Sequence, residues 1–245
     1  MTSFKKTSTV ALLTALAGVA LSGSAHAATD GVDGDADSAA LGNHQKHVRV
    51  DLGARTQFIK SSGFDPFSEK DALTQVSLAA SGVFWTQDAA SLAAVIGFDY
   101  GETSARARSD QADLSLARFI LAPELRYHLL RVLVLTAKVG PTLTRESAQL
   151  SGGGFGSDLM KTSWKFGVDA TAGAAVELWG YAKGTTHRPR LWATAEGGYG
   201  WTAPMKLNLE PADGTTAPQR LVAPTLDDLS ISGPLFRVTV ALSYW

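Results

Sequence analysis

Residues 164–178 read Trp-Lys-Phe-Gly-Val-Asp-Ala-Thr-Ala-Gly-Ala-Ala-Val-Glu-Leu, and their alternation decides the fold class. The even-numbered positions, from Trp164 to Leu178, are apolar. The odd-numbered positions, from Lys165 to Glu177, are charged, small or hydroxyl-bearing. Successive side chains of a strand point to opposite faces, whereas a helix would mix the two sets on every turn. The stretch therefore predicts an amphipathic β-strand.

The same period of two recurs along the chain from residue 46 onward. In the first run Val48, Val50 and Leu52 share one face, while Arg49 and Asp51 share the other. Six further candidate strands lie at about 73–86, 91–103, 114–128, 132–145, 190–202 and 235–245, which gives eight in total. Eight is the smallest even number of strands in single-chain outer-membrane barrels. The pattern thus predicts an all-β fold, an eight-stranded antiparallel up-and-down transmembrane β-barrel.

The connections between these runs alternate between longer and shorter. They cover about 60–72, 87–90, 104–113, 129–131, 146–162, 182–189 and 203–234. Outer-membrane barrels have long extracellular loops and short periplasmic turns, so both termini are expected in the periplasm. The connection 203–234 is rich in proline, which cannot donate to a sheet ladder, so we expect an exposed, irregular loop there.

Composition narrows the class of protein. The chain has 245 residues, 22 Lys plus Arg, 23 Asp plus Glu and no cysteine. This excludes a zinc-thiolate site, a disulfide scaffold and a binder of bulk polyanions, so no nucleic-acid partner is expected. Hydrophobic residues make up 45% and charged residues 18%, enough for a folded body, but the apolar residues are too interspersed for a bundle of membrane helices.

The first 27 residues have the features of a cleaved signal peptide. Lys5 and Lys6 are followed by an apolar stretch from Val10 to Leu21 and by the small-x-small sequence 25–27. The apolar stretch is short for a membrane-spanning helix, which makes a retained anchor the alternative. Residues 28–45 are small and acidic and predict a flexible segment. The barrel domain is expected over 46–245, with the protein exported to the bacterial outer membrane.

The polar face of the strands carries more charge than a ligand cavity would hold, which favours lipid outside and a packed lumen inside. Seven cations and six anions on this face predict paired charges, because an unpaired buried ion is costly. The expected lumen charge network comprises Arg49, Asp51, Arg55, Asp99, Arg118, Glu124, Arg126, Lys138, Lys165, Asp169, Glu177, Glu196 and Arg237.

Aromatic residues with polar tips gather near the predicted strand ends, as in the two girdles of a membrane barrel. Those expected at the periplasmic rim are Trp85, Tyr127, Trp179, Tyr181 and Tyr244. Those expected at the outer rim are Tyr100, Trp164, Tyr199 and Trp201.

The chain ends on a strand in which Phe236, Val238, Val240, Leu242 and Tyr244 alternate before a final Trp245. This ending resembles the carboxy-terminal assembly signal of bacterial outer-membrane β-barrels. The usual signal keeps its apolar series in phase with the last residue, whereas here Trp245 follows the series. In architecture the chain is similar to the eight-stranded class that includes the OmpA transmembrane domain and the OmpX-like and OmpW-like proteins. The resemblance implies outer-membrane lipid and the barrel-assembly machinery as partners.

The sequence offers no convincing catalytic or metal site, and no cofactor is expected. The histidines of the expected mature chain are His44, His47, His128 and His187, none of which falls on the predicted extracellular side. The His-x-Ser pattern of barrel lipid A deacylases is absent. His44 and His47 share a spacing that suits a metal, but no third ligand accompanies them.

We therefore expect a non-enzymatic outer-membrane barrel that acts in envelope integrity or surface interaction, with an extracellular ligand bound through loop 203–234. Three alternatives stay open. The first is a narrow channel or an OmpW-like conduit for small or hydrophobic solutes. The second is a soluble periplasmic barrel of the lipocalin type. The third is an enzyme acting on lipid A through loop carboxylates and serines.

Overall fold

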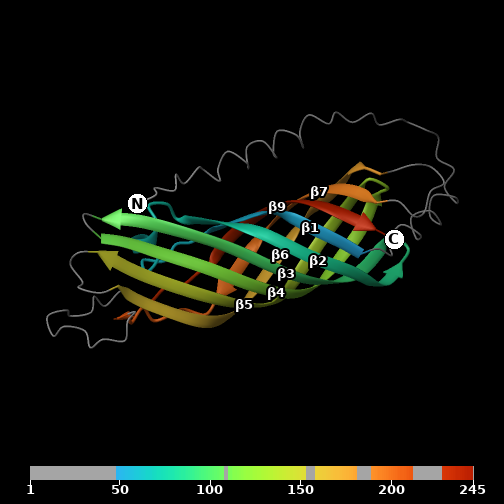
Figure 1. Cartoon of the computed structure of the whole chain (residues 1–245). Coiled ribbons are helices and arrows are strands. Elements are labelled where there is room, and N and C mark those ends of the chain that lie inside the picture. Colours follow the sequence, from blue (N-terminus) through green and yellow to red (C-terminus); the bar gives the residue numbers. More distant parts are fainter. Residues whose placement is uncertain (1–47, 108–109, 153–157, 181–188, 212–227, 245) are drawn as a thin grey trace.

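The computed structural model describes residues 48–107, 110–152, 158–180, 189–211 and 228–244 (Figure 1). The elements are strands apart from one short 3-10 helix, η1 (Asp65–Phe67). None of the described helical segments is long and apolar enough to cross a membrane. The strands are β1 (Val48–Phe58), β2 (Ala72–Gln87), β3 (Ala90–Ala107), β4 (Asp110–Leu130), β5 (Leu133–Gly152), β6 (Leu159–Trp179), β7 (Arg190–Thr202), β8 (Glu210–Pro211) and β9 (Gly233–Tyr244).

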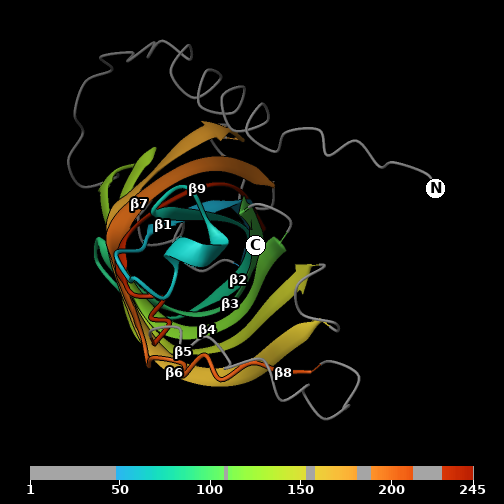
Figure 2. The ribbon, with the colours of Figure 1, turned by 90° about the vertical axis from the view of Figure 1, so that its left-hand side faces the viewer.

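Eight of these strands close into a ring. The sheet order is β5-β4-β3-β2-β1-β9-β7-β6, β5 also pairs with β6, and every pairing is antiparallel. Figure 2 looks into this ring from one end. The predicted eight-stranded antiparallel barrel is confirmed. The two-residue β8 lies outside the ring and pairs with β6 at Leu159 and Met160.

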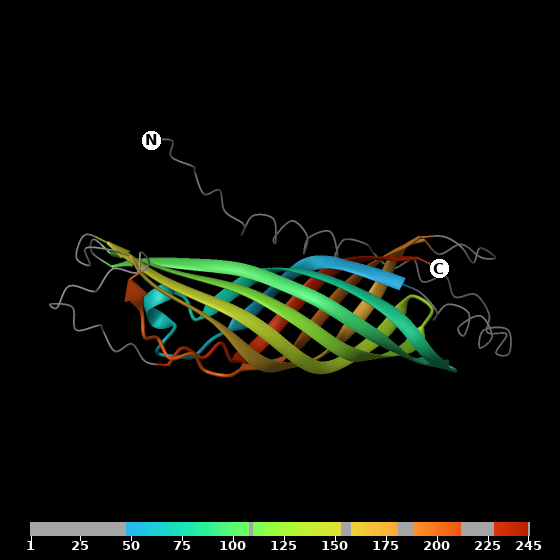
Figure 3. The ribbon, with the colours of Figure 1, turned by 60° about the horizontal axis from the view of Figure 1, so that its bottom comes forward.

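The ring is closed by the first and last strands of the chain. Val48 of β1 pairs with Tyr244 of β9, so the chain enters and leaves the barrel at the same end. At the opposite end β3, β4, β5 and β6 project beyond the other strands (Figure 3). We call this projecting four-stranded sheet the extension; it comprises residues 101–107, 110–116, 146–152 and 159–163.

The extension corrects the sequence-based boundaries. Residues 104–113 and 146–162 were expected to be loops, but most of them continue the strands β3, β4, β5 and β6. Period two persists through these residues, and what changes is which of the two faces is apolar. The expected strands 91–103, 114–128, 132–145 and 164–178 all stop short of the observed ends on this side, and for β5 and β6 the expected end coincides with the end of the outward apolar series.

Two connecting segments fold into the mouth of the extension. The segment 59–71, which contains η1, and the segments 203–211 and 228–232 together form what we call the cap (Figure 2). They contribute Ile59, Phe64, Phe67, Met205, Leu207, Leu209, Leu229 and Ile231 to a buried apolar cluster with inward residues of β2, β4, β5 and β6. Both described ends of the connection 203–234 are mostly irregular, as expected, but the expectation that they are exposed is wrong for their apolar side chains, which cover the apolar inner face of the extension.

Inward-facing glycines let neighbouring strands coil closely around the narrow ring. A Cβ atom on Gly173 would lie 2.1 Å from the Ala195 carbonyl oxygen, and one on Gly198 would lie 2.0 Å from that of Ala170. Both positions therefore require glycine on steric grounds.

Candidate functional site

All thirteen predicted lumen residues lie on the inward face of their strands. Ten of them are buried, and Asp51, Lys138 and Lys165 are partly buried. Arg55, Asp99 and Arg118 are completely inaccessible to solvent. The barrel therefore holds its charges inside and presents the apolar series outward.

Nine of these residues form one continuous series of ion pairs in which cations and anions strictly alternate. In order they are Arg126, Glu124, Lys138, Glu196, Arg237, Asp99, Arg55, Asp169 and Arg118. Neighbours in the series lie between 2.5 and 4.0 Å apart. Every strand of the ring except β2 contributes at least one member, and Gln75 of β2 accepts a hydrogen bond from Arg55 at 2.9 Å. The series thus ties all eight strands together across the lumen.

Asp99 and Asp169 are the shared anions at the centre of the series. Asp99 lies 2.9 Å from Arg237 and 3.5 Å from Arg55. Asp169 lies 3.1 Å from both Arg55 and Arg118. Each carboxylate therefore compensates two guanidinium groups, and removing either would leave two cations without their common partner.

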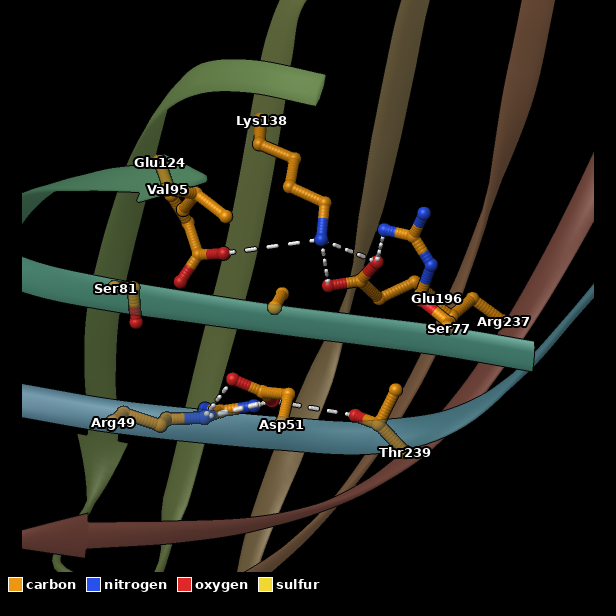
Figure 4. Close-up of a pocket in the computed structure, with 11 residues that line it drawn as sticks. Arg49, Asp51, Ser77, Ser81, Val95, Glu124, Lys138, Glu196, Arg237 and Thr239 are labelled. Atoms are coloured by element: carbon orange, nitrogen blue, oxygen red, sulfur yellow. Dashed lines mark hydrogen bonds and ion pairs between the residues drawn. The ribbon is translucent and has the colours of Figure 1, made fainter. Parts of the chain in front are cut away.

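Lys138 bridges Glu124 of β4 and Glu196 of β7 inside the lumen (Figure 4). Its ammonium nitrogen lies 2.7 Å from Glu196 and 4.0 Å from Glu124. The adjacent pocket, which Arg49 and Asp51 also line as a contacting ion pair, has a volume of about 10 Å³. A single water molecule needs about that much space. Side chains therefore fill this part of the lumen.

The outer face of the barrel is an apolar band bordered by aromatic residues. Trp85, Tyr127, Trp179 and Tyr244 are exposed at the end where the chain enters and leaves. Tyr100, Trp164, Tyr199 and Trp201 are exposed at the other border. Tyr181 and Trp245 lie outside the described residues. Of the predicted assembly signal, Phe236, Leu242 and Tyr244 are exposed on the outer face, and Val238 and Val240 are partly exposed on the same face.

Polarity inverts along the extended strands at one level. In β4 the inward residues Leu114 and Leu116 are apolar, and the next inward residue, Arg118, is charged. The outward residues change in the opposite sense, from Asp113 and Ser115 to Phe119 and Leu121. The inversion runs across the sheet along the paired row Tyr100, Ala117, Arg145 and Trp164. Beyond this row the buried inward residues of β4 and β5 are apolar except Glu146, and their outward residues are polar, as in a water-soluble fold.

Glu146 is the inward residue just beyond this row, between the charged lumen and the cap. It pairs across the sheet with Leu116 and Ser163, and it is completely buried. Within the described part of the chain, neither of its carboxyl oxygens has a hydrogen-bond partner. Burial raises the pKa of Glu146 to about 8, although the cations Arg118 and Lys165 oppose this shift. Glu146 is therefore held mainly in its neutral form at pH 7.

The described residues contain no group of three or more histidine, cysteine or carboxylate side chains able to hold a metal ion. His128 is buried on the inward face of β4, and His44, His47 and His187 lie outside the described residues.

No protein-family model matches the chain, and a search of characterised proteins finds no match either. Solved structures with a similar fold include Ail, the attachment invasion locus protein of Yersinia pestis, with a TM-score of 0.46 and 10% identity over 82% of this chain and 99% of that one. A structure of Ail with the heparin analogue sucrose octasulfate gives a TM-score of 0.45. Neisserial surface protein A (NspA) has a TM-score of 0.41 and 13% identity over 81% of this chain and 95% of that one.

Glu146, Arg190 and the cap were not predicted from the sequence. Arg190 is buried and lies 3.5 Å from Glu177, and it is in phase with the inward residues Trp192 and Thr194. Extending the inward series by one step would have found it. The cap has a weaker signal, the spacing of Met205, Leu207 and Leu209 within a proline-rich connection.

Proposed function

We propose that the protein is a non-enzymatic outer-membrane barrel that holds a rigid, capped extension at the cell surface. One observation carries this proposal: the inversion of polarity along β3, β4 and β5 at the row of Tyr100, Arg145 and Trp164. The outward face of each strand is apolar along one segment and polar along the next. Such a strand suits a barrel whose wall passes from the hydrocarbon of the membrane into water.

The length of the apolar band supports a membrane-spanning role. From Ala117 to Tyr127 the outward face of β4 is apolar or aromatic over eleven residues. At about 3.3 Å per residue and a strand tilt of about 40°, this corresponds to a height of about 25 Å. The hydrocarbon-facing band of outer-membrane barrels has about this height.

The closed ring also supports the proposal. Hydrocarbon offers no hydrogen-bond partners, so strands span a membrane only when every backbone group is paired within the barrel. The ladder closes at the pairs β1–β9 and β5–β6. A soluble ligand-binding barrel would place Leu121 and Phe166 inside and Arg118 outside, the reverse of the arrangement seen.

The packed lumen favours an anchor over a conduit. Nine alternating charges fill the space between the strands, and the cap covers the end beyond them. We infer that the action of the protein, in envelope integrity or in contact with a surface ligand, belongs to the extension and the cap. The signal peptide over 1–27 and assembly by the barrel-assembly machinery are parts of the same proposal.

Single-cysteine labelling tests the membrane position, because the natural chain has no cysteine. Three variants report on three levels: Ser104→Cys in the extension, Leu121→Cys in the apolar band and Gln87→Cys at the opposite end. With a membrane-impermeant maleimide, we expect labelling of Ser104→Cys in intact cells and of Gln87→Cys only after permeabilisation. Leu121→Cys should stay unlabelled in membranes.

Equal labelling of all three variants in the aqueous fraction would instead establish a soluble barrel. Labelling of Gln87→Cys but not Ser104→Cys in intact cells would reverse the orientation.

A further inference from the structure

Arg145 is an outward-facing cation at the border between the apolar band and the extension. It lies on β5, where it pairs with Ala117 on one side and with Trp164 on the other. The next outward residue below it, Leu143, is exposed and apolar. The next one above it is Ser147. Arg145 therefore marks the level at which hydrocarbon meets the polar layer if the barrel spans the membrane as proposed.

The guanidinium of Arg145 has no partner among the described residues. It takes part in no hydrogen bond or ion pair within the described residues, and its side chain is exposed to the surroundings of the barrel. Arg106, an outward arginine of the extension, instead donates to Gln111 at 3.2 and 3.1 Å. Arg145 is thus available to an external anion in a way that Arg106 is not.

Two further features surround Arg145 with the groups that a lipid headgroup requires. Trp164, half exposed, stands beside it on the neighbouring strand. The hydroxyls of Ser147 and Thr162, 2.9 Å apart, form the next rung above on the same outer face. A flat amphipathic ring, a cation and two hydroxyls therefore lie together at one level.

We propose that Arg145, Trp164 and the hydroxyl pair of Ser147 and Thr162 bind the phosphate-bearing headgroup of an outer-leaflet lipid. A guanidinium matches the geometry of a phosphate group and pairs with it through two parallel hydrogen bonds. Tryptophan suits the same interface because its ring is apolar and its N–H is polar. The inference rests on the proposed membrane position of the barrel.

A lipid suits this surface better than a soluble anion. Directly below Arg145 the outer face continues as Leu143 and Phe166, both exposed and apolar. Acyl chains would cover these residues while the headgroup contacts the cation above them. A free phosphate ion would leave this apolar surface uncovered.

Native mass spectrometry of the detergent-solubilised full-length protein tests the proposal. The probes are a bisphosphorylated glycolipid with several acyl chains and the same lipid without its phosphates. We expect the natural protein to retain the phosphorylated lipid, and Arg145→Gln to retain about tenfold less, as for the loss of one charge-assisted pair. The matched control Arg106→Gln should retain as much as the natural protein. Arg145→Lys should retain an amount of the phosphorylated lipid between those of the natural protein and Arg145→Gln, because lysine keeps the charge but cannot make the two parallel hydrogen bonds.

Four results would overturn the assignment. Three of them are unchanged retention in Arg145→Gln, an equal loss in Arg106→Gln, and equal retention of the lipid without phosphates. The fourth is displacement of the glycolipid by inorganic phosphate alone, because the site would then bind the free ion. The gel mobility of each sample is first compared before and after heating. Absence of a heat-dependent shift in the natural protein would contradict the proposed membrane barrel, whereas it would not test the headgroup site.

Discussion

Arg118 shows how a single buried cation is compensated inside this barrel. It is completely buried, yet it donates to Thr144 at 3.1 Å, to Asp169 at 3.1 Å and to Thr202 at 3.0 Å. Each of these acceptors lies on a different strand. A buried ion pair adds little net stability over an apolar pair of the same shape, but breaking one leaves a charge uncompensated. Arg118 thereby links β4 to β5, β6 and β7 inside the lumen.

Asp99→Asn tests this role directly. The substitution leaves Arg55 and Arg237 without the carboxylate that they share, so we expect the free energy of unfolding to fall by about 3 kcal/mol. Urea unfolding in lipid vesicles, followed by tryptophan fluorescence, measures the change. Asp113→Asn, on the outward face of the extension, is the control and should change it by less than about 0.5 kcal/mol. A loss for Asp99→Asn no greater than that of the control would show that the network is dispensable.

Glu146 predicts a pH dependence of stability. Its pKa in the folded state is about 8, against an ordinary value of 4.5, so the folded protein binds this proton more tightly than the unfolded chain does. The neutral carboxyl contributes to the free energy of unfolding fully below about pH 4.5, and this contribution is lost as the pH rises toward about 8. The free energy of unfolding should therefore fall with rising pH by on the order of a few kcal/mol because of Glu146, and Glu146→Gln should remove this fall.

Unfolding midpoints at pH 5, 7 and 9 measure the effect of Glu146, and the exposed Glu102→Gln is the control. Parallel pH profiles of Glu146→Gln and the natural protein would contradict the assignment.

At the scale of elements, β4 shows why boundaries were harder to predict than strands. Its alternation continues from Ala112 to Tyr127, so the strand itself was predictable. At Leu116 and Ala117, however, the apolar series changes from the inward to the outward face. The expected strand 114–128 already crosses that change, but it starts four residues late. The pairing of Asp110 with Ala107 of β3 and with Gly152 of β5 shows that β4 begins earlier, because its neighbours extend as far.

We expect the cap to unfold without unfolding the barrel. Phe67 is completely buried in the cap, so Phe67→Ala should cost about 3–5 kcal/mol of the local packing energy. We expect limited proteolysis to cleave within 59–71, while the gel shift on heating stays as in the natural protein. Phe58→Ala, at an exposed outward position of β1, is the control and should not increase cleavage. Loss of the heat shift in Phe67→Ala would mean that the cap and the barrel fold as one unit.

At the scale of the whole molecule, the chain has two interiors of opposite character. One is a lumen of paired charges inside an apolar wall, and the other is an apolar cluster inside a polar wall. They share β3, β4, β5 and β6 and meet at Glu146. This arrangement suits a body that stands partly in hydrocarbon and partly in water.

Closure of the ring predicts resistance to detergent. We expect the folded protein to migrate differently on a gel before and after boiling, because a closed ring has no free edge from which to unravel. Identical migration of the two samples would contradict a closed barrel.

The carboxy-terminal end predicts an assembly defect. Tyr244 pairs with Val48 at the point where the ring closes. Deleting Tyr244 and Trp245 should reduce the amount of heat-shifting protein in the membrane fraction severalfold. Deleting two residues from the expected flexible segment 28–45 is the matched control. A normal membrane yield for the terminal deletion would show that these residues are not needed for assembly.

The alternation of residues was enough to predict the period of two, the number of strands and the face on which Arg118, Asp169 and Arg237 lie, because side-chain direction in a strand is a local property of the backbone. The folded barrel was needed to show that Asp99 pairs with both Arg55 and Arg237, that Glu146 lies between two interiors, and that the segments around Phe67 and Leu229 fill the mouth of the extension. Those contacts join residues far apart in the chain, and their partners depend on how the ring closes and on the shear between its strands, neither of which a local pattern contains.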